Sequence, residues 1–264
     1  RKSGGERMLI TATMPDTPQR KLAGALTRFL DKANIPYRRL SEQMNLGNIL
    51  YDRDLDLLVI AYGGPPVPSW QCAAVPQFTN SCPGKVEALL TAFGRPAHVI
   101  HLASNSDDFQ KRIPQCYDLD LFMHLATNDQ GKKIALLYPA CIEGDAAGSK
   151  SLSHVLAEFE RLKIEVVQLS REDFLSLAAN SISPEPGRLL MTARISKALR
   201  QQLQARGVRA IAPRNNQVMG SKQYKYGLHC LTVELPATAP KRPSAAACRR
   251  CVAMSCSLMR PRTR

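Results

Sequence analysis

The sequence has no long apolar run, few aromatic residues and no complete set of zinc ligands. No uninterrupted apolar stretch approaches the roughly 18 residues of a membrane-spanning helix, so we expect no membrane partner. Aromatic residues make up only 6% of the chain, although 44% of its 264 residues are hydrophobic and 22% are charged. That composition is typical of a globular protein with one large or two small domains. The apolar stretch at residues 8–14 is too short and too polar for a signal peptide, so we expect a cytoplasmic protein.

The C-terminal cysteines lack the fourth ligand that a structural zinc site needs. The stretch "CRRCVAMSC" holds three of the eight cysteines at a C-x2-C-x4-C spacing, with no further ligand nearby. Structural zinc uses four ligands, usually in two close pairs. We therefore expect free cysteines here, and no metal or other cofactor. The remaining cysteines are scattered along the chain: Cys72, Cys82, Cys116, Cys141 and Cys230.

Acidic residues are absent from the last 28 residues, which carry seven Lys or Arg. Half of the net charge of +14 therefore lies in this tail. A basic tail binds polyanions weakly and without sequence preference. The tail has no interleaved aromatic residues, and no nucleic-acid-binding module is recognisable in the chain. We predict one folded domain over residues 8–236, a disordered tail over 237–264, and at most weak, non-specific nucleic-acid binding by the tail.

What the sequence does contain is a weak internal repeat, in which an amphipathic helix pattern leads directly into a short strand pattern. It occurs four times, at residues 19–40, 82–102, 151–169 and 193–213. Apolar residues three to four apart predict one buried helix face, and the period then shortens toward two. Further strands are predicted at residues 55–62, 119–126, 132–139 and 187–193. Each unit thus has the order β-β-α-β, with Gly207 placed to end the last helix, and such repeats predict units that cover one another's cores.

The order of several segments resembles the pentein superfamily, which includes arginine deiminases, dimethylarginine dimethylaminohydrolases and amidinotransferases. "YDLDLFMHL" (117–125) resembles the strand with the family's His-x-Asp motif, and "YDRDLDLL" (51–58) resembles its Arg-Asp strand. "GLHCLTVELP" (227–236) is similar to the final segment that bears the nucleophilic cysteine. The resemblance implies an α/β propeller of five β-β-α-β units. Because this chain has four helix–strand repeats, we expect one blade to be incomplete.

The resemblance also implies a cysteine-dependent hydrolase of guanidino groups. In this family the cysteine thiolate attacks the guanidinium carbon, ammonia or an amine leaves, and water converts the thiouronium intermediate to a ureido product such as citrulline. A histidine transfers the protons, and carboxylates hold the guanidinium. By position, Cys230 is the expected nucleophile, and Asp54 and Asp120 are the expected substrate-binding carboxylates. The expected substrate is arginine or an N-methylated arginine.

Two features depart from the family pattern. Asp118 stands where the family has histidine, and on a strand it would face the same side as Asp120. Asp118 is then the residue left for proton transfer, which a carboxylate performs near neutral pH only when its pKa is raised. We expect no other histidine to substitute, because His124 lies six residues along the same strand, about 20 Å away. The family's Glu-Gly-Gly-Asp stretch is also missing between Asp54 and Asp118.

Three functions remain open from the sequence. The first is the hydrolase, supported by the ordered likeness of the C-terminal half. The second is a catalytically impaired member that acts as a binding or structural module, in which Cys230 is a buried apolar residue of a strand. The third is polyanion binding through residues 237–264. The residues fit hydrolase and amidinotransferase chemistry alike, since these differ in whether water or an amine attacks the intermediate.

Overall fold

The computed structural model describes residues 9–13, 24, 27–32, 37–43, 46–61, 83–102, 116, 118–142, 151–191 and 194–212. Within these ranges, the strands form three three-stranded sheets and one two-stranded sheet. In each three-stranded sheet, the first strand pairs antiparallel with the second. The second strand then pairs parallel with the third, and a helix connects the two.

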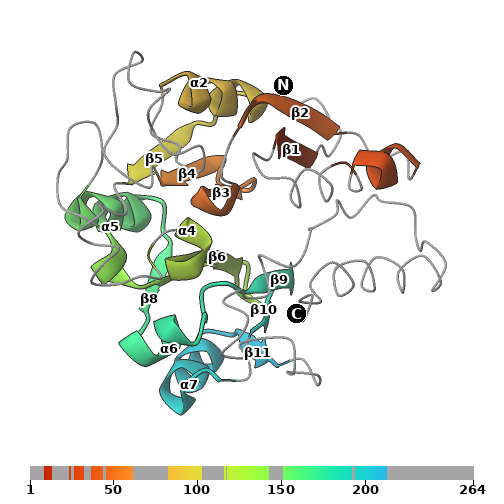
Figure 1. Ribbon diagram of the computed structural model, residues 1–264. Coiled ribbons are helices and arrows are strands. Elements are labelled where there is room, and N and C mark those ends of the chain that lie inside the picture. The colour runs from red at the N-terminus through yellow and green to blue at the C-terminus, as the bar shows by residue number, and fades with distance from the viewer. Residues whose placement is uncertain are drawn as a thin grey trace, which may run out of the picture.

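These three sheets are successive copies of one β-β-α-β unit. The first unit comprises β3 (Ile49–Asp52), β4 (Leu57–Ala61), α2 (Pro83–Ala92) and β5 (His98–Leu102). The second comprises β6 (Met123–Thr127), β7 (Lys133–Leu137), α5 (Leu152–Arg161) and β8 (Glu165–Gln168). The third comprises β9 (Ile182–Glu185), β10 (Arg188–Leu190), α7 (Lys197–Ala205) and β11 (Arg209–Ile211). The predicted unit is therefore confirmed three times. Figure 1 shows α2, α5 and α7 on the outside of the molecule.

The N-terminal part forms a smaller sheet. β1 (Leu9–Thr13) pairs parallel with β2 (Tyr37–Gln43), and residues 27–32 between them are helical. All four predicted helix–strand repeats are thus present. The remaining short elements are η1 (Leu46–Asn48), α4 (Leu119–Phe122), η3 (Pro139–Cys141) and α6 (Arg171–Leu175).

The strand predicted over residues 119–126 begins later than expected. Residues 119–122 form α4, a single helical turn, and β6 begins at Met123. All four residues of α4, including the charged Asp120, are buried, so burial does not alternate along "LDLF". A short segment that is buried on every side does not distinguish a helix from a strand by its period. The expectation that Asp118 and Asp120 share one face of a strand is therefore wrong.

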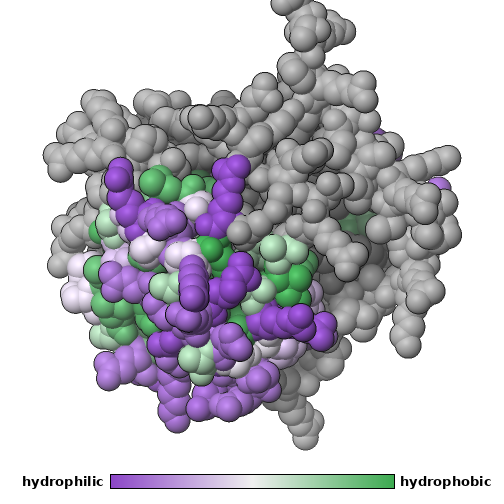
Figure 2. Space-filling model, turned by 90° about the horizontal axis from the view of Figure 1, so that it is seen from below, coloured by the Kyte–Doolittle hydropathy of each residue, from purple (hydrophilic) through white to green (hydrophobic). Residues whose placement is uncertain are grey.

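Two clusters of buried side chains hold the units together. One cluster joins the first and second units and includes Val59, Phe122 and Phe159. The other joins β7, β8, β10 and α7 and includes Leu136, Val167, Leu189, Leu199 and Leu203. On the face of the molecule seen in Figure 2, hydrophilic side chains predominate among the described residues. The units therefore bury their apolar faces against one another, as a repeat architecture requires.

One face of each of α5 and α7 is buried, as the spacing of the apolar residues in these two repeats predicts. Leu199 and Leu203 of α7 are buried, as are Val155 and Phe159 of α5. Leu156 of α5 is also one of the apolar residues of its repeat, but 38% of it is exposed. Since residues one apart on a helix point about 100° apart, Leu156 lies beyond the edge of the stripe formed by its neighbour Val155.

Gly207 ends α7 as predicted, and its backbone has a φ of +72°. An alanine at this position would adopt a left-handed conformation, and its Cβ would approach the carboxylate of Asp129, an exposed side chain that can turn aside. We expect Gly207→Ala to lower the free energy of unfolding by about 1 to 2 kcal/mol, from the left-handed backbone. Gly131→Ala is the control, because Gly131 has a φ of +77° but no atom within 4 Å of the added Cβ. Urea denaturation should show a similar loss for both variants, and a much larger loss at Gly207 would show that Asp129 is held in place.

Candidate active site

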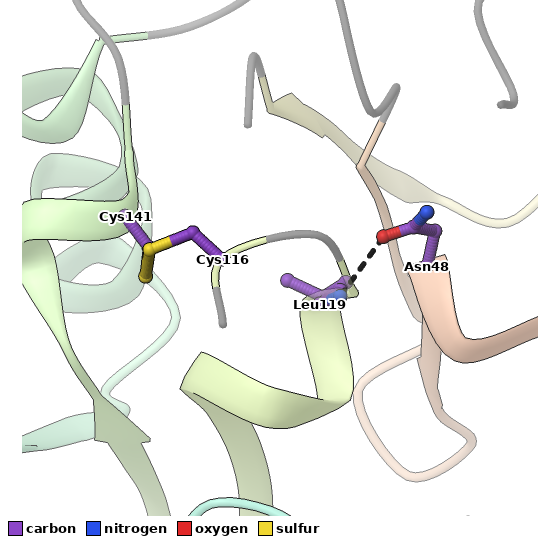
Figure 3. Close-up of a disulfide and its surroundings, with 4 residues drawn as sticks. All are labelled: Asn48, Cys116, Leu119 and Cys141. Atoms are coloured by element: carbon purple, nitrogen blue, oxygen red, sulfur yellow. Dashed lines mark hydrogen bonds between the residues drawn. A yellow bond between two sulfur atoms is a disulfide. The ribbon is translucent and has the colours of Figure 1, made fainter. Parts of the chain in front are cut away.

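The acidic segment Asp118–Asp120 lies where the three units meet. Asp118 is the N-cap residue of α4 and is half-buried, whereas Asp120 is only 3% exposed. On one side, the backbone N–H of Leu119 donates to Asn48 Oδ1 at 2.9 Å, as Figure 3 shows. On the other side, Asn180 Nδ2 donates to the backbone carbonyl of Asp120 at 3.4 Å. Side chains from the first and third units therefore hold the acidic segment of the second.

The residues that meet here occupy similar places in their units. Asn48 directly precedes β3, the acidic segment precedes β6, and Asn180 lies two residues before β9. β6 contacts both β3 and β9, so the starts of the three strands come together. Asn48 is 1% exposed and Asn180 is 0% exposed, and buried amides of this kind need hydrogen-bond partners. Sequence reasoning missed both residues, because an asparagine next to a strand is a common turn residue.

A disulfide fixes the start of the same segment. Cys116, two positions before Asp118, is bonded to Cys141 of η3, with 5.3 Å between their Cα atoms (Figure 3). Both cysteines are fully buried. The bond ties the approach to α4 to the chain that leaves β7. Sequence reasoning missed it, because a separation of 25 residues carries no pairing signal.

Asp54, the expected substrate-binding carboxylate, lies at the other end of β3 from Asn48. It follows β3 in the turn toward β4, and the four residues of β3 span about 13 Å. Its side chain is 76% exposed and forms an ion pair with Lys133 Nζ at 2.7 Å. The structure therefore brings Asp118 and Asp120 together with Asn48, and brings Asp54 to a lysine of β7.

Lys133 also pairs with Asp52, at 2.7 Å from its carboxylate. The other oxygen of Asp52 accepts the backbone N–H groups of Asp54 and Leu55, both at 3.0 Å. Burial by itself lowers the pKa of Lys133, but hydrogen bonds to Asp52 and Asp54 outweigh it, so that pKa is raised. The hydrogen bond to Lys133 lowers the pKa of Asp54. This cluster is therefore an internal ion-pair network that fastens the first unit to the second.

Lys133→Met is expected to lower the free energy of unfolding by about 3 kcal/mol at neutral pH, because it leaves the Asp52 carboxylate buried without its cation. Lys132→Met, at the exposed neighbouring position, is the control and should change stability by less than about 0.5 kcal/mol. Equal losses in urea denaturation would show that the network contributes nothing.

The same ion-pair network makes the stability of the fold depend on pH, and the direction of that dependence follows from the pKa shifts of Lys133 and Asp54. The raised pKa of Lys133 stabilises the fold below about pH 10, and this contribution is lost as pH rises through that pKa. The lowered pKa of Asp54 stabilises the fold above about pH 4, and this contribution is lost as pH falls. In Lys133→Met, the free energy of unfolding should fall less at alkaline pH than in the unsubstituted protein, because the lysine that titrates there is gone.

The structure bears differently on the expectations for a metal, for the nucleophile and tail, and for membrane-spanning helices. Within the described ranges, no three His, Cys, Asp or Glu side chains gather as metal ligands would. Cys230, the expected nucleophile, and the basic tail at 237–264 lie outside the described residues. Every helix in the described part of the chain is too short or too polar to cross a bilayer.

Comparison with known proteins gives matches of structure rather than of sequence. No family model and no curated protein matches the chain. Among solved structures, the apo form of ArgZ, an arginine dihydrolase from the ornithine–ammonia cycle in cyanobacteria, matches with a TM-score of 0.58 and 14% identity, over 89% of this chain and 31% of ArgZ. The N-terminal domain of ArgZ bound to substrate matches with a TM-score of 0.51 and 16% identity, over 79% of this chain and 64% of that domain. SxtG, an amidinotransferase from the saxitoxin pathway of Microseira wollei, matches with a TM-score of 0.54 and 10% identity, over 88% of this chain and 65% of SxtG.

These proteins are all penteins, the superfamily that the sequence resembles. The chain spans less than two thirds of the length of each of them. At identities of 10% to 16%, the likeness is one of fold. The described part of the chain is therefore similar in fold to these penteins, with three of the repeated β-β-α-β units present in the described residues.

Proposed function

We propose that the chain is a cysteine-dependent hydrolase of guanidino groups, built as a pentein-type α/β propeller with one incomplete blade. Its substrate is arginine or an N-methylated arginine, and its product is citrulline with ammonia or an amine. The observation that carries the proposal is the buried acidic segment, held between Asn48 and Asn180 where three units meet. The pentein fold adds support, because solved proteins with this fold include an arginine dihydrolase, an agmatine deiminase and an amidinotransferase.

In the proposed reaction, the thiolate of Cys230 attacks the guanidinium carbon, and the C–N bond to the leaving nitrogen breaks. Water then attacks the thiouronium carbon, the C–S bond breaks, and the ureido product leaves. Asp118 in its acid form gives a proton to the leaving nitrogen and then, as a carboxylate, accepts the proton of the attacking water, and Asp120 binds the guanidinium. Asp54 is also assigned to the substrate, and to contact a guanidinium it would have to exchange Lys133 for it.

The burial of Asp120 suits a cationic substrate. A guanidinium binds a carboxylate through two parallel N–H···O bonds in one plane. Water screens charges little at a side chain that is 3% exposed, so the attraction there is stronger than at the protein surface. Asp120 is therefore better placed to hold a guanidinium than the exposed Asp54.

The alternative is a catalytically impaired protein that binds a guanidine or serves as a structural module. It is favoured by Asp118 in the place of histidine and by the missing Glu-Gly-Gly-Asp stretch. It predicts that arginine binds without being converted.

The test is ureido-product release from arginine and from dimethylarginine by the purified chain. The rate at which iodoacetamide alkylates Cys230, followed by mass spectrometry, is measured alongside with and without arginine. Product release supports the hydrolase. Protection of Cys230 by arginine without release supports the binding module. Neither release nor protection overturns the hydrolase and the guanidine-binding module and leaves the structural module.

The proposal keeps the folded domain at residues 8–236, the basic tail at 237–264 and the cytoplasmic location. The disulfide between Cys116 and Cys141 is the observation that bears most directly on the location, because disulfides are rare in a reducing cytosol. Mapping the free thiols of the protein in its own cells tests the location: a permanently oxidised pair would contradict it.

A further inference from the structure

The helical turn α4, which carries Asp120, is held at both ends by the chain that leaves β7. At its C-terminal end, the backbone N–H of Tyr138 donates to the carbonyl of Phe122 at 2.8 Å. On its N-terminal side, Cys116 is bonded to Cys141 of η3. Tyr138 and Cys141 belong to one tight turn, because the N–H of Cys141 donates to the Tyr138 carbonyl at 3.2 Å. A single turn of the chain therefore holds both sides of α4.

This turn is anchored independently of the disulfide. The ring of Tyr138 stacks on that of Phe174 in α6, with 4.2 Å between the ring centroids. Phe174 is fully buried in the cluster that joins the first and second units. Breaking the disulfide would thus leave the turn in place. It would release the start of the acidic segment, which follows Cys116 by two residues.

Hydrogen bonds to the neighbouring units would then have to hold that start. The N–H of Leu119 donates to Asn48 Oδ1 at 2.9 Å, and Asn180 Nδ2 donates to the Asp120 carbonyl at 3.4 Å, beyond the usual range of about 2.7–3.2 Å. In Figure 3, the disulfide and the bond to Asn48 lie on opposite sides of the start of α4. A segment that loses its covalent tether on one side opens locally more often.

We propose that Cys116 and Cys141 form a redox switch, in which the bonded pair fixes the acidic segment and the reduced pair lets it open. The reductant is a dithiol. One of its thiolates attacks a sulfur of the pair, the S–S bond breaks, and a mixed disulfide forms. The second thiol of the reductant then displaces the protein sulfur, so that two electrons and two protons pass to the two cysteines and the reductant leaves as a disulfide. Because both cysteines are fully buried, this exchange begins when the segment opens locally.

A reversible bond fits the proposed cytoplasmic location, where the disulfides that do form are usually transient or redox-sensing. Its consequence for the site rests on the proposed function. Arginine should bind the reduced protein more weakly, because the carboxylates that hold the guanidinium are no longer fixed. By linkage, arginine should also slow the reduction of the pair.

Hydrogen exchange at the backbone amide of Leu119, followed by NMR spectroscopy, tests the switch without reference to catalysis. We expect exchange to become about tenfold faster or more when dithiothreitol reduces the protein. The amide of Leu203 in α7, outside the segment between the two cysteines, should exchange at an unchanged rate. The double variant Cys116→Ala/Cys141→Ala should show the faster exchange at Leu119 both with and without dithiothreitol, which separates this pair from the other cysteines.

Equal exchange at Leu119 in the oxidised and the reduced protein would overturn the switch. A bond that dithiothreitol leaves intact in the folded protein would overturn it too, since the bond would then be a permanent crosslink. Alkylation of the released thiols, followed by mass spectrometry of the peptides with Cys116 and Cys141, decides this point. If the double variant does not fold, these two measurements on the unsubstituted chain decide. Absence of ureido-product release from the oxidised chain would overturn the hydrolase and leave the exchange result, and the switch, unaffected.

Discussion

Cys230→Ser is expected to abolish ureido-product release, with kcat lowered by roughly 10⁴-fold or more. A serine hydroxyl is not ionised near neutral pH, so no group of comparable nucleophilicity remains to attack the guanidinium carbon. The thiouronium intermediate cannot form without the sulfur. Release of citrulline from arginine, measured over hours with the substituted and unsubstituted chains at equal concentration, checks the expectation.

The matched control for this substitution is Cys82→Ser, because Cys82 has no role in the proposed reaction. Its rate should equal that of the unsubstituted chain. Mass spectrometry of the acid-quenched reaction supplies an independent measurement, since the covalent intermediate should add the mass of the substrate less its leaving group to the peptide with Cys230. Release that survives in Cys230→Ser would remove the cysteine from the mechanism altogether.

Asp118→His is expected to raise the rate of product release by about 10²-fold. A carboxylate accepts a proton from water poorly, because its ordinary pKa of about 4 is far below the pH of the reaction. An imidazole at the same position titrates near neutral pH and is a better match for that transfer. The segment can accept the change, since Asp118 is half-buried at the start of α4 and not enclosed by it.

Asp118→Asn is the control for the effect of charge. It removes the negative charge, which would otherwise raise the pKa of a nearby thiol, but supplies no proton-transferring group. If proton transfer limits the reaction, the histidine variant should be faster than the asparagine variant at every pH between 6 and 8. Equal gains in both variants would mean that Asp118 slows the reaction through its charge, and a fall in the histidine variant would show that the aspartate is the base that the site requires.

The helix–strand repeat could be predicted because its signal is local. Each helix is long enough to show one apolar face, as α7 does with Leu199 and Leu203, and each is followed by a short strand. Strand positions followed from the same reasoning, and β4, β7 and β10 fall within their predicted ranges. The three repeated units could therefore be predicted from the pattern of apolar residues, whereas the pentein-type fold was implied by the resemblance of the segments to that family.

The site could be predicted only in part, because its contacts join residues far apart in sequence. The acidic segment was identified, but the bond from Leu119 to Asn48 spans 71 residues, and the ion pair between Asp54 and Lys133 spans 79. Neither contact leaves a trace in local composition. A single helical turn such as α4 is also too short to show a helical period, so its sequence suggested a strand. The placement of Asp54 beside Lys133 depended on information of this non-local kind.

The disulfide between Cys116 and Cys141 encloses α4, β6 and β7 in one covalent loop of the chain, since the two cysteines are 25 residues apart. Closing a loop of that length removes conformational entropy from the unfolded chain, which corresponds to about 3.5 kcal/mol of stability. The strands β6 and β7 cannot separate beyond the limits of this loop even when the rest of the chain is unfolded. The two strands of the hairpin that follows the acidic segment are thus tethered within one covalent loop before folding begins.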